Sequence, residues 1–316
     1  MIILKITIIG SGFVGATAAH ILALKNIVDE IVLIDILEGV PQGKALDMTQ
    51  SSAIENFKTK IIGTNSYEAT KNSDIIIITA GIARKPGMTR DELLQTNVKI
   101  VSSVVKQAVQ YSPESILIVV SNPLDAMVYT AYKTSGFPRY RVIGMAGILD
   151  TARYKTLIAD RLNIDAAKID CFVIGSHGDT MIALPRLTKA DGKQLDKLLT
   201  KTEIDEIVSK TKNGGAEIVG LLKTGSAYYA PASSIVEMIT AIVNDTGKVL
   251  PCCVFLNGEY GIKNIFVGVP VILGKEGLKE IVEIELNDEE LLLLNNAADA
   301  VRELSGLVDC FLADEK

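Results

Sequence analysis

Short apolar runs alternate with longer amphipathic segments along the first 145 residues of the chain. The short runs are rich in β-branched residues and predict strands, whereas the longer segments place apolar residues three or four positions apart and predict helices. This alternation is typical of βαβ units, so it predicts an α/β fold with a doubly wound parallel sheet. The predicted strands are residues 2–9, 30–35, 74–79, 115–121 and 141–144, and the predicted crossover helices are residues 13–25, 41–54 and 91–111.

The pattern changes after about residue 145, where strands and helices no longer alternate regularly. A hairpin is expected around Asp191-Gly192, followed by two long helices. Residues 249–256 and 265–273 are predicted strands, and the turn-rich segment between them indicates that they are antiparallel. Asn287 is a candidate N-cap for a last helix over about residues 288–307. This second half therefore has the pattern of an α+β domain.

No low-complexity linker or fixed-period repeat separates the two halves. We therefore expect residues 1–145 and residues 146–316 to form two coupled domains that share a cleft. The chain has 316 residues, of which 48% are hydrophobic and 22% are charged, so it is long enough to bury a large core as a soluble globular protein.

The charge balance limits the possible partners of the protein. A formal net charge of −6 gives no general attraction to phosphate backbones, so nucleic acid is not an expected partner. The apolar first residues lead into a glycine loop rather than a cleavage site, and no apolar run has membrane-spanning length. We therefore expect a cytoplasmic chain with no membrane partner.

Cysteine and histidine are scarce in this sequence. The four cysteines have neither the Cys-x-x-Cys spacing nor the histidine neighbours of a metal site, and we expect them to be small buried hydrophobic residues. His20 and His177 are the only histidines, so we expect no metal, and any imidazole chemistry must use one of them. His20 lies within a predicted crossover helix with no acid partner evident nearby, which favours a packing or surface role.

A glycine fingerprint follows the first predicted strand and opens the first predicted helix. Its glycines allow a tight turn, a close approach of the backbone to a pyrophosphate, and tight packing of helix on strand. Asp35 ends the second strand, where a carboxylate can accept hydrogen bonds from a ribose diol and would repel a 2′-phosphate. The order of these features predicts a Rossmann-type site for NAD rather than an ordinary turn. The fingerprint consists of Gly10, Ser11, Gly12, Phe13, Val14 and Gly15.

A second group of residues has the chemistry of proton transfer. Asp150 and Arg153 are one helical turn apart, and His177 lies between glycines just after a predicted strand. A histidine suits the transfer of a hydroxyl proton near neutral pH, and Asp150 would fix its tautomer and raise its pKa. Taken separately, the same residues could form a surface ion pair and a turn histidine.

The loop of residues 81–91 leaves the carboxyl end of a predicted parallel strand, where ligands bind in open α/β sheets. Its glycines and proline indicate a loop that can close as a lid. Its three cations, Arg84, Lys85 and Arg90, are either solvated charges or ligands for an anionic substrate.

Five segments of the chain together resemble the lactate/malate dehydrogenase family. They occur in the order of the family, they cover nearly the whole chain, and their combination is far more specific than any one motif. Within the family, the sequence most resembles the members that act on malate and are built on the lactate dehydrogenase plan. The segments are Gly10 to Gly15, Ala83-Arg84-Lys85-Pro86-Gly87-Met88-Thr89-Arg90, Ser121-Asn122-Pro123-Leu124-Asp125, Asp150-Thr151-Ala152-Arg153 and Gly175-Ser176-His177-Gly178-Asp179.

The resemblance implies a role for each matched residue of the substrate site. His177 is the acid/base and Asp150 is its partner. Arg153 grips the carboxylate that all substrates share, and a planar bidentate fork suits this contact. Arg90 reaches from the lid, binds the substrate and polarises its carbonyl during catalysis. Asn122 contacts the substrate and lines the nicotinamide side.

The resemblance also implies two looser assignments. Asn97 is expected to bind the cofactor, as is Asn122. Ser226 falls near the position of the pocket wall. Residues 1–145 would then be the NAD-binding domain and residues 146–316 the catalytic domain.

Arg84 carries the expectation about the substrate. The lactate enzymes of the family usually have a neutral glutamine at the matching loop position, whereas an arginine can neutralise the second carboxylate of malate or oxaloacetate. With pyruvate, lid closure would leave this guanidinium unpaired, so oxaloacetate should be preferred by roughly a thousandfold. Lys85 is interpreted as a solvated neighbour.

These residues predict an NAD-dependent enzyme that reversibly converts malate to oxaloacetate, as in the tricarboxylic acid cycle. Two alternatives stay open, which are a lactate or broad 2-hydroxy acid dehydrogenase and a non-catalytic NAD-binding module. The resemblance further implies a homo-oligomer, a dimer or a homotetramer, with residues 41–54 as a candidate interface helix. The pair Gly214-Gly215 interrupts a helical stretch and indicates a helix break or a kink beside the pocket.

Overall fold

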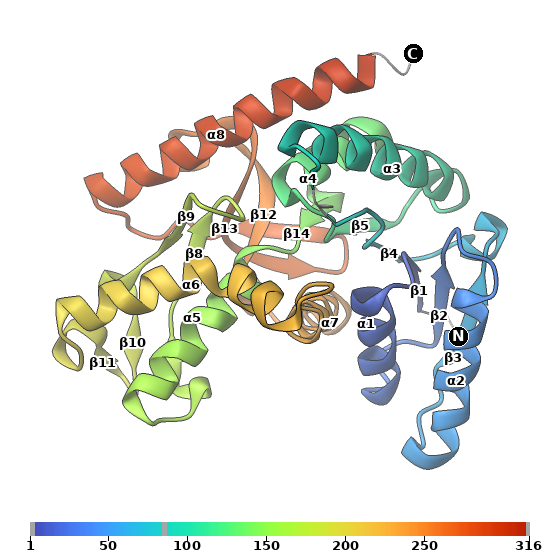
Figure 1. The fold of residues 1–316 in the computed structure, drawn as a ribbon, viewed down its shortest axis with the longest axis horizontal. Coiled ribbons are helices and arrows are strands. Elements are labelled where there is room, and N and C mark those ends of the chain that lie inside the picture. Colours follow the sequence, from blue (N-terminus) through green and yellow to red (C-terminus); the bar gives the residue numbers. More distant parts are fainter. Residues whose placement is uncertain (1–3, 84–86, 314–316) are drawn as a thin grey trace.

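The computed structural model describes residues 4–83 and 87–313, and its centre is one eleven-stranded sheet (Figure 1). The first six strands run parallel in the order β3-β2-β1-β4-β5-β6, which confirms the predicted doubly wound fold. The strands are β1 (Lys5–Ile9), β2 (Glu30–Ile34), β3 (Lys60–Thr64), β4 (Ile75–Ile78), β5 (Ile116–Val119) and β6 (Val142–Gly144).

The helices of the first half begin and end close to their predicted bounds. Strand β3, the helix after β5 and two short 3-10 turns were not predicted. In β3, Gly63 interrupts the apolar run, and a Cβ at this position would lie 2.1 Å from the carbonyl oxygen of Pro41. Glycine therefore lets the start of α2 pack directly on the strand. The helices are α1 (Phe13–Leu24), α2 (Val40–Glu55), α3 (Arg90–Tyr111) and α4 (Leu124–Ser135), with short 3-10 turns η1 (Tyr67–Thr70) and η2 (Arg139–Arg141).

Both faces of the parallel sheet are covered, which explains why its strands are continuous apolar runs. Alternate residues of the central strands, such as Ile77 and Ile78 in β4, belong to two different buried clusters. Helices α3, α4 and α8 (Asp288–Ala313) lie over one face, and α1 and α7 (Tyr229–Asn244) lie over the other (Figure 1).

The second half contains the longest helix of the described chain, which has 26 residues. The predicted hairpin around Asp191-Gly192 is present, since β10 and β11 pair as antiparallel strands. The predicted antiparallel pair is also present as β12 and β13. The elements are α5 (Gly147–Leu162), α6 (Lys201–Leu222), α7 (Tyr229–Asn244), α8 (Asp288–Ala313), β7 (Ile169–Asp170), β8 (Val173–Gly175), β9 (Met181–Ala183), β10 (Lys189–Ala190), β11 (Lys193–Gln194), β12 (Val249–Asn257), β13 (Lys263–Gly274), β14 (Gly277–Ile281), η3 (Ala166–Lys168), η4 (Pro185–Leu187), η5 (Leu195–Lys197) and η6 (Glu259–Gly261).

The sheet does not end where the first half ends. β12 pairs antiparallel with β6 through Cys253 and Gly144, and β13, β8 and β9 continue the sheet beyond it. The two halves are therefore joined by backbone pairing as well as by the chain.

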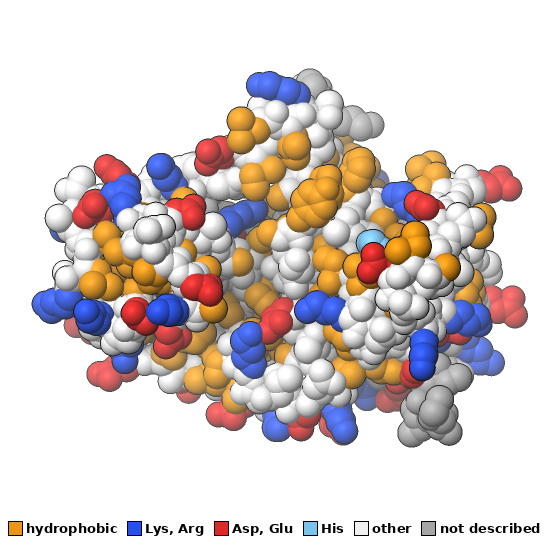
Figure 2. All heavy atoms as spheres, turned by 90° about the horizontal axis from the view of Figure 1, so that it is seen from below, with side chains coloured by type: hydrophobic (Ala, Val, Ile, Leu, Met, Phe, Trp, Pro, Cys, Tyr) orange, Lys and Arg blue, Asp and Glu red, His pale blue; other side chains and the backbone are white. Residues whose placement is uncertain are grey.

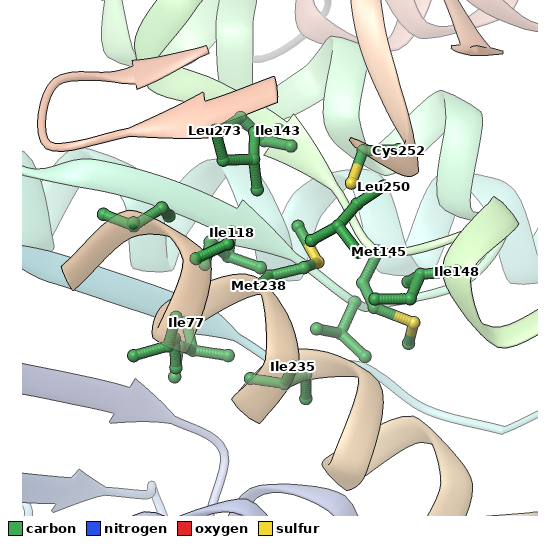
Figure 3. Packing of buried hydrophobic residues seen from close by; sticks show 14 of the residues in the cluster. Ile77, Ile118, Ile143, Met145, Ile148, Ile235, Met238, Leu250, Cys252 and Leu273 are labelled. Carbon is green, nitrogen blue, oxygen red and sulfur yellow. The ribbon is translucent and has the colours of Figure 1, made fainter. Parts of the chain in front are cut away.

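Helix α7 of the second half packs on the parallel sheet of the first half (Figure 3). Ile235 and Met238 of α7 belong to one buried cluster with Ile77, Ile118 and Ile143 of the strands. Each of these five side chains is at most 1% exposed. The packing fixes one half against the other across the face of the sheet.

Helix α6 corrects one of the sequence predictions. It runs without a break from Lys201 to Leu222 through Gly214 and Gly215, so the expected helix break at this pair is wrong. The long helix begins with a capping box between Thr200 and Glu203, which satisfies N–H groups of its first turn.

The predicted cap of the last helix is confirmed. The Oδ1 atom of Asn287 accepts a hydrogen bond from the backbone N–H of Glu290 at 2.8 Å, and Glu290 accepts one from the N–H of Asn287 at 3.0 Å. Arg186 of η4 forms a bidentate pair with the Glu290 carboxylate. This pair ties the start of α8 to the segment that follows β9.

Charged side chains of both signs are mixed over the face seen in Figure 2, with hydrophobic side chains between them. Within residues 4–83 and 87–313, no helix is both long and apolar enough to cross a bilayer. The same residues contain no cluster of three or more histidine, cysteine, aspartate or glutamate side chains placed to hold a metal ion.

Candidate active site

The glycine loop joins the end of β1 to the start of α1, as predicted. Gly10 has a φ of +104°, and a Cβ there would lie 2.7 Å from Oγ1 of Thr79. A Cβ at Gly15 would lie only 2.0 Å from the carbonyl oxygen of Gly10. These two glycines are therefore required by the fold itself, because the loop folds back tightly against β4 and α1.

Gly12 differs from the other two glycines of the loop. It is exposed, and a Cβ at this position would have no heavy atom within 4 Å. Gly12 is also the N-cap of α1, and no side chain caps this helix end. Open space beside a helix N-terminus with uncapped N–H groups suits the pyrophosphate of a dinucleotide. The residues at this position thus fit the cofactor that the sequence predicts.

Asp35 lies just after β2 and contacts the same loop. Its Oδ2 atom accepts hydrogen bonds from the backbone N–H of Ser11 at 2.8 Å and from the Ser11 hydroxyl at 3.0 Å, and its Oδ1 atom accepts one from Leu37 N–H at 3.1 Å. The carboxylate therefore stays beside the loop, with lone pairs left for a ribose diol.

Sequence reasoning missed Lys44, which also contacts the glycine loop. Its ammonium in α2 donates to the carbonyl oxygen of Ser11 and lies 5.8 Å from the centre of the Phe13 ring. No local motif marks this lysine, because its contact depends on how α2 packs beside the loop.

Asn97 of α3 holds together the ends of two parallel strands. Its side chain accepts a hydrogen bond from Ile82 N–H at 2.8 Å and donates to the carbonyl oxygens of Ile82 at 3.1 Å and Asn122 at 2.7 Å. Asn97 is 1% exposed, whereas Asn122 is exposed at the end of β5. The amide of Asn97 thus positions the root of the predicted lid beside Asn122. Its direct contact with the cofactor stays a prediction.

The predicted lid is described only in part. Arg84, Lys85 and Pro86 lie outside the described residues, so the expected position of Arg84 is untested. Arg90 is exposed at the start of α3, directly after a capping box between Thr89 and Glu92. Within the described part of the chain, no contact joins the Arg90 guanidinium to His177, and its role stays a prediction.

The structure brings His177, Asp150 and Arg153 together. Nδ1 of His177, which follows β8, lies 2.8 Å from Oδ2 of Asp150 in the first turn of α5. Nη1 of Arg153 donates to Oδ1 of the same carboxylate at 3.1 Å. The Asp150 side chain is only 2% exposed, so the interpretation of Asp150 and Arg153 as a surface ion pair does not hold. These groups form one buried cluster.

The surroundings of His177 raise its pKa above the ordinary value of 6.5. Burial alone lowers the pKa, because it disfavours the charged imidazolium. The charge of Asp150, the hydrogen bond to Asp150 and the charge of Asp125 all raise the pKa. Together they outweigh burial and the smaller lowering effect of the Arg153 charge. Because Nδ1 faces Asp150, Nε2 is the ring atom left to exchange a proton with a substrate.

Arg153 lies against the glycine pair of α6. A Cβ at Gly214 would lie 3.3 Å from Cδ of Arg153, and one at Gly215 would lie 3.6 Å from its Nη2. The Nε atom of Arg153 is buried and has no hydrogen-bond partner in the structure. A carboxylate that reached this guanidinium would supply the missing acceptor. The sequence marked the glycine pair but not its contact with Arg153.

Ser226 is exposed in the segment between α6 and α7. Two residues later, the Tyr228 ring stacks on Phe13 of the glycine loop with 5.2 Å between ring centres. The segment thus lies against the cofactor loop, but among the described residues no contact joins Ser226 to His177. Its role as a pocket wall stays a prediction.

Asp125 was part of a recognised motif, but sequence reasoning gave it no role. It lies in the first turn of α4, and its carboxylate accepts hydrogen bonds from His177 N–H at 3.0 Å and from Cys253 Sγ at 3.4 Å. An acid one turn after a parallel strand was the available signal, but its partners are 52 and 128 residues away in the sequence.

Comparison with known proteins gives matches over both halves of the chain. Residues 4–144 match the family described as lactate/malate dehydrogenase, NAD binding domain, and residues 148–306 match the lactate/malate dehydrogenase, alpha/beta C-terminal domain. A malate dehydrogenase of Bacillus israeli is 55% identical over 300 residues, which cover 94% of this chain and 96% of that protein.

Two solved structures show how far the likeness extends. The malate dehydrogenase of Salinibacter ruber is 44% identical with a TM-score of 0.94, over 99% of this chain and 100% of that one. A lactate dehydrogenase of Cryptosporidium parvum, complexed with lactic acid and the cofactor nicotinamide adenine dinucleotide, is 41% identical with a TM-score of 0.94, over 98% and 99% of the two chains.

Proposed function

Because the chain belongs to the lactate/malate dehydrogenase family, we propose that it is an NAD-dependent malate dehydrogenase, which reversibly converts malate and NAD to oxaloacetate and NADH. The names of its relatives support malate as the substrate. The single observation that carries the chemistry is the buried cluster in which Asp150 contacts both His177 and Arg153.

The cofactor would be held by the glycine loop and by Asp35. The N-terminus of α1 and the open space at Gly12 suit its pyrophosphate, and the Asp35 carboxylate suits a ribose diol. When bound, the nicotinamide supplies the site that accepts or donates the hydride. Asn122 lies at the end of β5 on the same edge of the sheet, where it can contact both cofactor and substrate.

His177 transfers the proton of the substrate hydroxyl. In malate oxidation, a neutral imidazole removes this proton at Nε2, and in oxaloacetate reduction the imidazolium returns it. Asp150 keeps Nδ1 protonated and stabilises the imidazolium, because its Oδ2 atom lies 2.8 Å away. The carboxylate thus orients the ring and tunes its pKa at the same time.

The substrate is oriented by arginines. Arg153 binds the carboxylate next to the reacting carbon, with its own position held by Asp150 and by the glycine pair of α6. Arg90 from the lid polarises the carbonyl oxygen, and Arg84 pairs with the second carboxylate. Ser226 contributes to the pocket wall.

A lactate or broad 2-hydroxy acid dehydrogenase is the second candidate function. The likeness to a lactate dehydrogenase at 41% identity and equal TM-score supports keeping it. The two candidates differ in the substrate that Arg84 selects, since pyruvate has no second carboxylate.

The deciding experiment measures NADH oxidation with oxaloacetate and with pyruvate on the same enzyme. We expect a ratio of kcat/KM values of roughly a thousand in favour of oxaloacetate. The Arg84→Gln variant should lower this ratio by at least about tenfold, since it removes the partner of the second carboxylate. Equal turnover of both substrates by the wild-type protein would favour the second candidate, and NADH binding without turnover would favour a non-catalytic module.

We further propose that the protein acts in the cytoplasm, in the tricarboxylic acid cycle, as a homo-oligomer. Helix α2 supports an interface, because Leu46 and Ile54 are 60% and 79% exposed on it. A tetramer would be distinguished from a dimer by light scattering of the purified protein.

The matched ranges support a division of the chain near residues 145 and 146 into an NAD-binding domain and a catalytic domain.

A further inference from the structure

We propose that Asp125 is a positioning residue for proton transfer, which fixes the backbone of His177 and places a second negative charge beside the imidazolium. This inference rests on the proposed function, because it concerns the same histidine. It differs from the role of Asp150, since Asp125 contacts the backbone of His177 and does not contact its ring nitrogens.

The position of Asp125 joins three elements of the site. The residue lies in α4 of the first half and is 4% exposed. Its Oδ2 atom accepts a hydrogen bond from the backbone N–H of His177 at 3.0 Å, and its Oδ1 atom accepts one from the thiol of Cys253 in β12 at 3.4 Å. The loop that carries the histidine is thus attached to the first half at the backbone of His177 itself.

Two carboxylates therefore hold His177 from different sides. Asp150 of the second half fixes the ring through Nδ1, and Asp125 of the first half fixes the main chain that carries the ring. A displacement of one half against the other would move these two anchors apart. The position of the His177 imidazole therefore depends on how the two halves are placed, although His177 itself belongs to the second half.

The charges around His177 act on its protonated form. Among the described residues, the titratable and charged groups that face it are Asp150 and Arg153 from α5 and Asp125 from α4, and Cys253 of β12 faces Asp125. Burial, together with the charge of Asp150, raises the pKa of Asp125 above its usual value, although the N–H and the charge of His177 and the thiol of Cys253 act in the opposite direction. The charge of Asp125 in turn raises the pKa of His177.

The Asp125→Asn variant tests this inference. An asparagine keeps a carbonyl oxygen for the His177 N–H but removes the charge. We expect the His177 pKa to fall by roughly one unit, because a nearby carboxylate no longer stabilises the imidazolium. The titration is followed by NMR on the full-length protein labelled in histidine, where only two imidazole signals occur. The His20→Gln variant assigns them.

A matched control separates this effect from the general cost of an aspartate-to-asparagine change. Asp74 also accepts a backbone N–H, that of Lys5 at 2.8 Å, but it lies before β4 and is exposed. Asp74→Asn should leave the His177 titration unchanged. If the curves of Asp125→Asn and the wild type superimpose, the inference is wrong.

Turnover gives a second readout. In Asp125→Asn, oxaloacetate reduction should decline at a lower pH than in the wild type, because less imidazolium is present. Asp125→Ala removes the acceptor as well, and we expect a further loss in kcat of roughly tenfold from the displaced ring. Unchanged kcat in a folded Asp125→Ala would contradict the positioning role. If the wild-type protein does not reduce oxaloacetate, the proposed function fails, whereas the NMR titration still tests Asp125.

Discussion

The glycine loop and the His177 cluster are built by different means. The loop uses backbone shape, since Gly10 and Gly15 let it fold tightly and Gly12 leaves open space at a helix end. The cluster uses side chains, since one buried carboxylate contacts both an imidazole and a guanidinium. The loop comes from one continuous segment, whereas the cluster joins α4, α5, α6 and the end of β8.

Because of this difference, the two sites should respond to different kinds of amino-acid substitution. A site made of backbone responds to the size of a side chain, because added atoms fill the space that a ligand needs. A site made of buried charges responds to the loss of a partner, because the remaining charge is left uncompensated. Substitutions in the two regions should therefore change different measured constants.

The largest expected effect comes from His177→Asn. It removes the proton-transferring ring without adding volume, so we expect kcat for oxaloacetate to fall by about a hundred- to ten-thousandfold. The Kd for NADH, measured by fluorescence titration, should stay close to that of the wild type. Loss of NADH binding in a folded His177→Asn protein would show that the two regions are not separable.

The pH dependence of turnover should follow the His177 cluster alone. The pKa of His177 is raised above 6.5, so the imidazolium persists to higher pH than in a free histidine. Oxaloacetate reduction, which needs the imidazolium, should be fastest below this raised pKa and decline as the pH rises through it. Malate oxidation, which needs the neutral ring, should decline as the pH falls through the same value. Profiles of kcat for both directions test this.

The glycine loop can be tested by two matched substitutions to alanine. Gly12→Ala should weaken NADH binding roughly tenfold, because a methyl group in the ligand space costs about 1–3 kcal/mol. Its melting temperature should hardly change, since the added Cβ meets no protein atom within 4 Å. Gly15→Ala should instead lower the free energy of unfolding by about 2–3 kcal/mol, because its Cβ overlaps the Gly10 carbonyl oxygen. Equal effects on binding and stability in both variants would contradict this distinction.

The smallest expected effect is at the contact between α6 and Arg153. Gly214→Ala should raise the KM for oxaloacetate roughly threefold to tenfold with kcat less affected, because its Cβ would displace the Arg153 side chain by a few tenths of an ångström. Gly220 lies in the same helix with open space around it and serves as the control. Gly220→Ala should leave KM unchanged and stabilise the protein by about 0.5–1 kcal/mol. The same rise in KM for both variants would show that Arg153 is not involved.

The sequence predicted the features that local rules determine. The strands around Ile8 and Ile77 are continuous apolar runs because both sheet faces are covered, and the capped start of α8 follows from the hydrogen-bonding chemistry of Asn287. The glycine loop was also predicted, because its backbone shape requires glycine at given positions. The cluster of His177 with Asp150 was expected from residue chemistry and family resemblance.

The missed features depend on packing between distant elements. Nothing near Asp125 shows that its partners are His177 and Cys253. Gly214 suggests a helix break by its low helix propensity, whereas tertiary packing keeps the helix intact and places Arg153 against it. A local sequence pattern shows neither the distant partners of Asp125 nor the contact between Gly214 and Arg153.

The covering of the parallel sheet by α7 has a consequence for synthesis on the ribosome. The strands that contain Ile77, Ile118 and Ile143 are all made by residue 144, but Ile235 and Met238, which cover them, come much later. At typical rates of translation, the chain from residue 145 to the end of α7 takes on the order of ten seconds to make. During this time the part of the nascent sheet that α7 later covers stays apolar and exposed. Chaperones that bind hydrophobic segments should therefore act on this protein before its second half emerges.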